Sequence, residues 1–246
     1  MRCEIGVHAA LRRPSGDRMG FVFELALRGE SSARKDIERW LTAGAADALA
    51  TLPDLDSLDV YTPARGPAHD PFNHDGPGPL MQILIDFPSR EALRSALSGI
   101  VRAVEPFPAG IAPTGAALER RFYTVANKAE PASLQAPFSY VVRYHRPAED
   151  EALFIKNYLA THPQTQAHLP RIRAIMCYLP LDGLNAPDLP SPDYLVGNEV
   201  VFDTVDDFNL AMLSPVREEL RAHYRAFPRF TGAHTHHPMQ RVRFAG

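Results

Sequence analysis

The two halves of this 246-residue chain repeat one pattern of apolar residues. An offset of 117 residues sets Phe138–Val142 on Phe21–Leu25 and Tyr178 on Tyr61, with no gap between these points. Beyond a loop of variable length, an offset of 115 residues continues the match. Few paired residues are identical, but their apolar spacing agrees throughout. We therefore infer that one structural module was duplicated and fused.

Each half contains strand and helix patterns in the order β-α-β-β-α-β. Alternating apolar residues predict the first strands around Phe21–Leu27 and Phe138–Tyr144, and a helical spacing of apolar residues follows each of them. The remaining strands are expected to end at Tyr61 and Tyr178, to span Leu80–Phe87 and Leu195–Phe202, and to lie near Leu118–Val125 and Met239–Phe244.

Several hydroxyl side chains stand where helices are expected to begin. Ser31 and Ser32 precede the first helix, and Ser89 and Thr204 precede the later helix of each half, so all four are predicted N-caps. Pro215 interrupts the last helical pattern and is expected to restart the helix, with Ser214 as the new N-cap.

The order β-α-β-β-α-β is that of the ferredoxin-like unit, in which both helices cover one face of a four-stranded antiparallel sheet. The bare faces of two such sheets can be buried together. We predict an α+β fold in which two ferredoxin-like modules pack sheet to sheet as an intramolecular dimeric α/β barrel. The expected parts are an extension at 1–19, a degenerate first module at 20–126, a linker at 127–136 and a second module at 137–246.

Composition excludes several classes of protein. The net charge is −3 and no long basic run occurs, which argues against a nucleic-acid partner. No apolar run approaches the ~20 residues that span a bilayer, so a cytoplasmic protein without a membrane partner is expected. The two cysteines, Cys3 and Cys177, are too few for a disulfide framework. Phosphate-binding glycine loops and a serine-hydrolase elbow are also absent from the sequence.

The second half resembles the EthD family of the dimeric α/β-barrel superfamily. The resemblance is carried by Phe138–Pro147, Phe154–Pro163, Leu169-Pro170 and the segment Val200–Phe208. In the family a His-x-Pro-like segment ends the first helix, whereas here His162 and Pro163 are adjacent. The superfamily includes isomerases, cyclases, monooxygenases, haem enzymes and proteins without an assigned reaction. The resemblance therefore implies the fold more strongly than the reaction.

His162 matches the characteristic histidine of that family and is the candidate catalytic residue. The offset of 117 residues sets Ala45 opposite it, so only the second half carries a histidine at this place. An imidazole suits general acid or base catalysis near neutral pH. The alternative is that His162 only interacts with the last carbonyls of its helix.

Aromatic residues of the second half are candidate ligand-binding groups, since pockets of this superfamily are lined by aromatic side chains. The alternative is that these side chains are ordinary core residues. The loops Thr62–Pro79 and Pro180–Tyr194 occupy equivalent places, and either could cover the mouth of a pocket. The candidate ligand-binding residues are Tyr140, Tyr144, His145, Tyr158 and Tyr178.

The run from His234 to His237 is the densest group of histidines. In an extended segment His234 and His236 share one face while His237 points the other way. The pair could bind a metal if His162, His145 or Glu199 converged on it. No complete ligand spacing is visible, and the sequence favours a solvent-exposed turn.

We expect a protein that binds or transforms a small aromatic, quinoid or lactone-like compound in the second module, with His162 as general acid or base. The alternatives are a non-catalytic ligand-binding or stress-associated module and a haem- or metal-dependent oxygenase. No resident cofactor is expected. Besides the small molecule, a second copy of the chain is the one expected partner, because exposed strand edges could build a homodimer.

Overall fold

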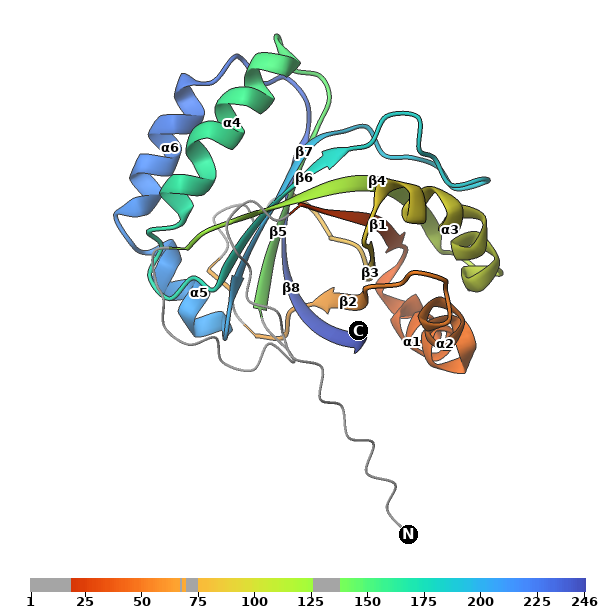
Figure 1. Ribbon diagram of the computed structural model, residues 1–246. Helices are drawn as coiled ribbons and strands as arrows, with labels where there is room; N and C mark the ends of the chain where they lie inside the picture. Colours follow the sequence, from red (N-terminus) through yellow and green to blue (C-terminus); the bar gives the residue numbers. More distant parts are fainter. Residues whose placement is uncertain (1–18, 67, 70–74, 126–137) are drawn as a thin grey trace.

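In the computed structural model, the described residues are 19–66, 68–69, 75–125 and 138–246. Their centre is a closed barrel of eight antiparallel strands (Figure 1). The strands are β1 (Met19–Arg28), β2 (Ser57–Pro63), β3 (Met81–Phe87), β4 (Ala112–Tyr123), β5 (Phe138–His145), β6 (Ala174–Pro180), β7 (Tyr194–Phe202) and β8 (His234–Ala245).

Both halves of the barrel have the same strand order. The first half runs β4-β1-β3-β2 and the second runs β8-β5-β7-β6, as two ferredoxin-like units require. The halves also join edge to edge, because β2 pairs with β8 and β4 pairs with β6. The predicted α+β class and tandem barrel are confirmed, while descent from one duplicated module stays a prediction.

Closure of the barrel removes the surface on which the homodimer prediction relied. Each of the eight described strands has a hydrogen-bonded neighbour on both sides. A sheet edge attracts further strands only while its N–H and C=O groups are unpaired. Strand edges in the described part of the chain therefore offer no route to a dimer.

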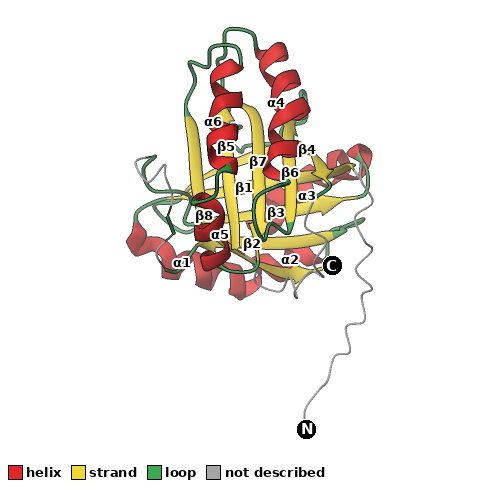
Figure 2. Ribbon diagram, turned by 90° about the vertical axis from the view of Figure 1, so that its left-hand side faces the viewer, coloured by secondary structure: helices red, strands yellow, loops and turns green. Residues whose placement is uncertain are grey.

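The helices lie outside the barrel on two opposite sides (Figures 1 and 2). Those of the first half follow β1 and β3, and those of the second half follow β5 and β7. They are the 3₁₀ turn η1 (Ser31–Ala33), α1 (Arg34–Trp40), the π-helical segment η2 (Leu41–Ala45), α2 (Ala46–Ala50), α3 (Arg90–Val104), α4 (Glu151–Gln166), α5 (Val205–Met212) and α6 (Val216–Ala226).

Alternation along each strand sends side chains to two different environments. On β5, Tyr140, Val142 and Tyr144 face the helices and join the core of the second half. Arg143 lies between them in sequence and faces the barrel interior, where its Nε donates to Glu24 of β1 at 3.0 Å. The two sheet faces are buried together as expected, but the interior between them is partly charged.

The loop after β2 and the loop after β6 each pack against the core of the other half. Leu184, Ala186 and Leu189, which follow β6, are buried in the core of the first half. Conversely, Ala64 and Ala68 of the loop after β2 pack against the core of the second half. Each half is thus completed by a loop of the other, which brings residues distant in sequence to one site.

Two of the four predicted N-caps are confirmed. Ser89 Oγ accepts a hydrogen bond from the Ala92 N–H at 3.0 Å, and Thr204 Oγ1 accepts from the Asp207 N–H at 3.1 Å. The prediction is wrong for Ser31 and Ser32, because both lie inside the turn η1 and neither caps a helix.

The last helix restarts near Pro215, as predicted, but Ser214 is not its cap. Ser214 Oγ donates backward to the Ala211 carbonyl at 2.8 Å, so it closes α5 instead of starting α6. Apart from Met19, which begins β1, the predicted extension lies outside the described residues, as does the predicted linker. Among the described residues, no helix is both long and apolar enough to cross a membrane.

Candidate functional site

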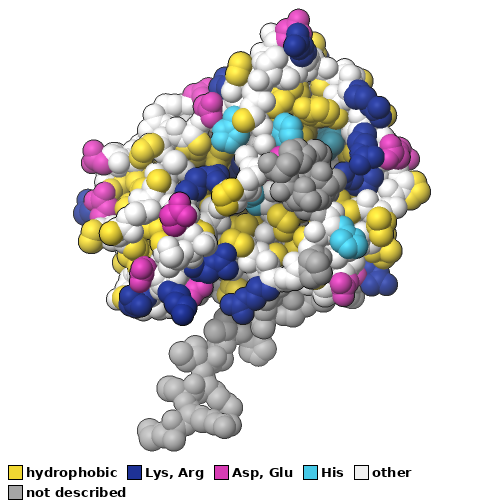
Figure 3. All heavy atoms as spheres, turned by 180° about the vertical axis from the view of Figure 1, so that it is seen from behind, with side chains coloured by type: hydrophobic (Ala, Val, Ile, Leu, Met, Phe, Trp, Pro, Cys, Tyr) yellow, Lys and Arg dark blue, Asp and Glu magenta, His cyan; other side chains and the backbone are white. Residues whose placement is uncertain are grey.

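A cavity of about 380 Å³ lies between the outer face of the second sheet and helices α4 and α6. On the face shown in Figure 3, histidine side chains gather beside an apolar hollow that Lys and Arg side chains border on one side. The cavity is lined from the sheet by Tyr140, Val142, Tyr144, Asn198, Val200, His234 and His236, and from the helices by Tyr158, His162, Gln166, Met212, Arg217, Leu220, Arg221, Tyr224 and Arg225.

Helix α4 carries one wall of the cavity. Asp150 begins it by accepting a hydrogen bond from the Leu153 N–H at 2.9 Å. Phe154, Tyr158 and His162 follow at intervals of four, which places them on the face turned toward the sheet. All three are buried, so the sequence pattern that folds the helix also fixes where His162 lies.

The adjacent His162 and Pro163 do not end the helix. Pro163 has no N–H for the Leu159 carbonyl, and the Gln164 side chain donates to that carbonyl instead, at 3.4 Å. Helix α4 continues to Gln166 as a result. His162 therefore lies inside a helical turn and not among its last free carbonyls, which disfavours a role as a simple C-terminal cap.

His162 is held as a neutral imidazole. Its ring stacks on Tyr158 with 4.6 Å between the ring centroids. Its Nδ1 is buried and has no hydrogen-bond partner among the described residues. Burial is the main cause that lowers the pKa of His162 to about 3, and the charges of His223 and Arg217 act in the same direction. A neutral imidazole keeps one ring nitrogen as a hydrogen-bond acceptor, and a ligand would have to reach this buried atom from the cavity that His162 lines.

The rim of the cavity is cationic. Arg217, Arg221 and Arg225 recur at intervals of four along α6, so they share one face of the helix, and all three line the cavity. Arg217 is also close enough to lower the pKa of the buried His162. Arg221 also forms an exposed ion pair with Glu218, so only part of this positive charge remains to favour a ligand that carries or develops negative charge.

The floor of the cavity holds a closed pair of amides. Gln166 Nε2 donates to Asn198 Oδ1 at 2.7 Å, and Asn198 Nδ2 donates back to Gln166 Oε1 at 3.0 Å. Asn198 Nδ2 also donates to the Met176 carbonyl at 3.2 Å. The pair joins the end of α4 to β7, and it places polar amide groups in the wall of the cavity.

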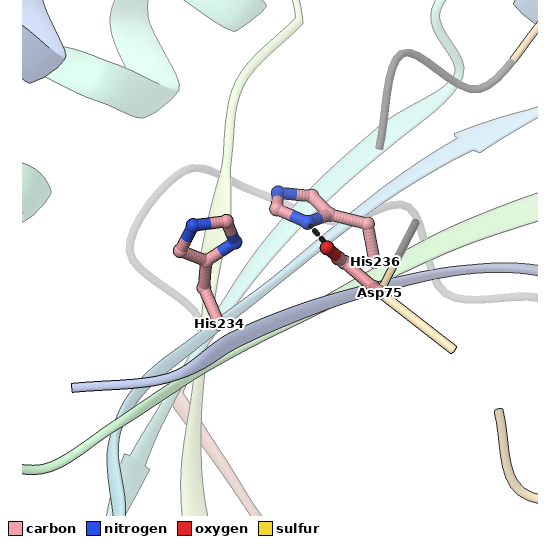
Figure 4. Close-up of side chains that lie close together, drawn as sticks. All are labelled: Asp75, His234 and His236. Carbon is pink, nitrogen blue, oxygen red and sulfur yellow. Dashed lines mark hydrogen bonds and ion pairs between the residues drawn. The ribbon is translucent and has the colours of Figure 1, made fainter. Parts of the chain in front are cut away.

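His234 and His236 lie in strand β8 and line the cavity, so the expectation of a solvent-exposed turn is wrong. Strand β8 begins at His234 because its N-terminal part pairs with β5. The predicted alternation is confirmed, since His237 lies on the opposite face, against Gly78. The pair is joined by Asp75, whose Oδ2 lies 2.7 Å from His236 Nδ1 (Figure 4).

The structure brings together some of the predicted residues and separates others. Tyr140, Tyr144, Tyr158 and His162 line one cavity. His145 does not line it, because its Nδ1 pairs with Asp193 at 2.7 Å. Tyr178 lies inside the barrel, where its hydroxyl donates to Glu199 at 2.6 Å. Glu199 and His145, two of the suggested further metal ligands, are thus engaged elsewhere.

Sequence reasoning missed the arginines of α6, the amide pair and Asp75. The arginine spacing was visible, but a charged stripe on a helix is usually solvated, so it was no signal of a cavity. Asp75 follows a run of residues outside the described part of the chain and belongs to the first half. No sequence pattern ties it to His236, which lies 161 residues away.

Comparisons with known proteins support the fold. No family model and no curated protein matches the sequence. Among solved structures, an anthrone oxidase-like protein superposes with a TM-score of 0.60 at 16% identity, covering 92% of each chain. A candidate monooxygenase from Lactobacillus acidophilus NCFM gives 0.51 at 12% identity, covering 92% of this chain and 94% of that one.

An EthD family protein from Bacillus halodurans C-125 also matches, at 18% identity and a TM-score of 0.31. It covers 40% of this chain and 96% of its own. At such identities the likeness concerns the fold alone. The chain has the fold of the dimeric α/β barrels, with both halves of the barrel carried by one polypeptide.

Proposed function

We propose that the cavity of the second half binds a small aromatic compound with a weakly acidic oxygen, and that His162 accepts its proton. The observation that carries the proposal is the buried, unpartnered Nδ1 of His162 in an aromatic cavity of about 380 Å³. Stacking surfaces from Tyr140, Tyr144 and Tyr158 suit a flat ring system.

The charges around the cavity would stabilise a ligand that becomes negative when it gives its proton to His162. A lone protonated His162 is disfavoured by burial and by Arg217. A phenolate or enolate beside the imidazole would favour the protonated form of His162, because the imidazolium and the anion together carry no net charge. Arg217 would also attract the anion. His162 would then act as a general base, and Arg217 would stabilise the negative oxygen.

Binding is tested by isothermal titration with 1-naphthol, with naphthalene as a probe of similar shape that lacks the hydroxyl. We expect 1-naphthol to bind more tightly than naphthalene. Leu220→Trp should abolish binding, because Leu220 is buried in the cavity wall. If Leu220→Trp does not fold, Met212→Trp is the second variant for this test. Met212 also lines the cavity but is less buried, so a larger side chain there disturbs the core less. Unchanged affinity in a folded cavity variant would place the ligand elsewhere.

Proton transfer is tested separately with 4-nitrophenol, whose absorbance reports its ionisation. In buffer below the pKa of the free phenol, we expect the wild type to bind the phenolate. His162→Gln should keep the affinity within about threefold but leave the bound phenol protonated, and Arg217→Gln should weaken binding of the anion. Arg229→Gln is the control, because this exposed arginine does not line the cavity. Binding without ionisation in the wild type would leave a non-catalytic binding protein.

A further inference from the structure

Three metal-binding side chains converge at the wall of the cavity. Asp75, His234 and His236 each offer one ligand atom, and these atoms all lie within 4.8 Å of one another (Figure 4). The histidines are two residues apart on β8, so both rings leave the same face of the strand. The carboxylate comes from the loop after β2, so the group is complete only when both halves of the chain are folded together.

We propose that Asp75, His234 and His236 bind one divalent transition-metal ion, with Zn²⁺ and Fe²⁺ as the chemical class. Two imidazoles and one carboxylate form a donor set that such ions prefer over Mg²⁺ or Ca²⁺. Ligands bonded at ~2.1 Å to one ion lie at most ~4.2 Å apart, so a small side-chain rotation would suffice. Three protein ligands would leave further coordination positions facing the cavity.

The side chains of two members of the group, Asp75 and His236, are buried, which distinguishes them from an ordinary ion pair on the surface. The side chains of Asp75 and His236 are only 5% and 6% exposed. Carboxylates taken out of water are found paired or bound to metal ions, and a metal ion here would be held by the same oxygen that now meets His236. A histidine–aspartate hydrogen bond would need only one imidazole, whereas here His234 stands beside His236 with 5.2 Å between the ring centroids.

Neighbouring aromatic rings hold the two imidazoles in place. Tyr140 packs against His236 with 5.7 Å between centroids, and Tyr144 and Phe230 each lie 6.2 Å from His234. Packing that limits ring rotation preorganises a metal site. His162 lines the same cavity as His234 and His236, so an ion at this group would share the cavity with the proposed base. The inference nevertheless concerns binding of the ion alone and does not depend on the proposed function.

The test uses the full-length protein without an affinity tag, stripped of metal with a chelator. Titration with Co²⁺ is followed by visible absorbance, and titration with Zn²⁺ by calorimetry. We expect one site per chain. Asp75→Ala, His234→Ala and His236→Ala should each weaken that site at least tenfold. Asp75→Asn should also weaken it while preserving the size of the side chain, and circular dichroism verifies that each variant is folded.

Asp193→Ala provides the matched control. Asp193 forms a histidine–carboxylate pair with His145 at the same 2.7 Å, but no second histidine joins it among the described residues. Its loss should leave Co²⁺ binding unchanged. A wild type that binds neither ion would overturn the inference, as would binding that survives Asp75→Asn and His236→Ala. Measuring 4-nitrophenol ionisation on the chelator-treated protein as well keeps either result independent of the role of His162.

Discussion

His162 is buried against Tyr158 in surroundings that oppose its charged form. The equivalent place in the first half, Ala45, ends the π-helical segment η2. Gly44 there has a φ of 149°, which interrupts the regular helix one residue before Ala45. Helix α4 has no such interruption and runs on past His162. The two halves therefore differ in backbone as well as in side chain at the residue that would carry the chemistry.

The lowered pKa of His162 predicts a loss of stability in acid. The unfolded chain binds this proton near pH 6.5, whereas the folded chain binds it near pH 3. The stabilising contribution is therefore complete above about pH 6.5 and is lost as the pH falls toward 3. His162→Gln should flatten the dependence of the unfolding free energy on pH between 4 and 6 by up to ~1.4 kcal/mol per pH unit.

Urea denaturation at several pH values measures this slope. His168→Gln is the control, because His168 is exposed on the surface. Burial also lowers the pKa of His237 to about 4, so part of the acid sensitivity should remain in the His162 variant. Equal slopes for the wild type and His162→Gln would contradict the buried, neutral state of His162.

At the scale of elements, the starts of the helices show which N-caps can be predicted from local sequence. Ser89 and Thr204 are extended residues directly before a regular helix, and both cap it. Ser31 has a similar sequence context but lies in a 3₁₀ turn with no capping hydrogen bond. A hydroxyl residue caps only when its backbone is extended, and the geometry of the preceding strand exit decides that.

Replacing a true cap and a false one should separate these cases. Ser89→Ala should lower the free energy of unfolding by about 1 kcal/mol, because the Ala92 N–H loses its acceptor. Ser31→Ala should change it by less than ~0.5 kcal/mol. Chemical denaturation of both variants measures the difference. Similar losses for the two substitutions would show that Ser31 stabilises the chain in a way that its hydrogen bonds do not reveal.

At the scale of the whole molecule, polar groups inside the barrel hold the halves together. Glu24 of β1 accepts from Arg143 of β5 at 3.0 Å and from the Tyr194 hydroxyl of β7 at 2.7 Å. Glu199 of β7 accepts from Tyr61 of β2 at 3.1 Å. These buried contacts cross from one half to the other, so the charges of Glu24 and Arg143 are paired only when both halves are folded together.

Removing the Glu24 charge should destabilise the whole barrel. Glu24→Gln leaves the buried Arg143 guanidinium without its carboxylate, which costs about 3–5 kcal/mol. The exposed pair of Arg39 and Asp36 provides a matched control, and Asp36→Asn should cost less than ~1 kcal/mol. Denaturant unfolding followed by circular dichroism compares the two. A loss in Glu24→Gln no larger than in Asp36→Asn would show that the interior ion pair contributes little.

The strand and helix order was predictable because it depends on local alternation and spacing. Phe138–Tyr144 and Leu195–Phe202 repeat the apolar period of their counterparts, and the strands β5 and β7 follow these limits closely. The start of β8 was not predictable, since the histidines there have no apolar alternation. Only pairing with β5 makes His234–His237 part of a strand.

The candidate site divides in the same way. The positions of its aromatic residues and of His162 along strand and helix follow from periodicity in one module. The sequence pointed to His162 itself through the resemblance to the EthD family and through the contrast with Ala45. The arginine rim facing the cavity, the exclusion of His145 and Tyr178, and the arrival of Asp75 at His236 were decided by the tertiary structure. The physical reason is range: periodicity acts between neighbours, whereas barrel closure and loop exchange join residues that lie far apart in the chain, 161 positions for Asp75 and His236 and 184 for Asp59 and Arg243.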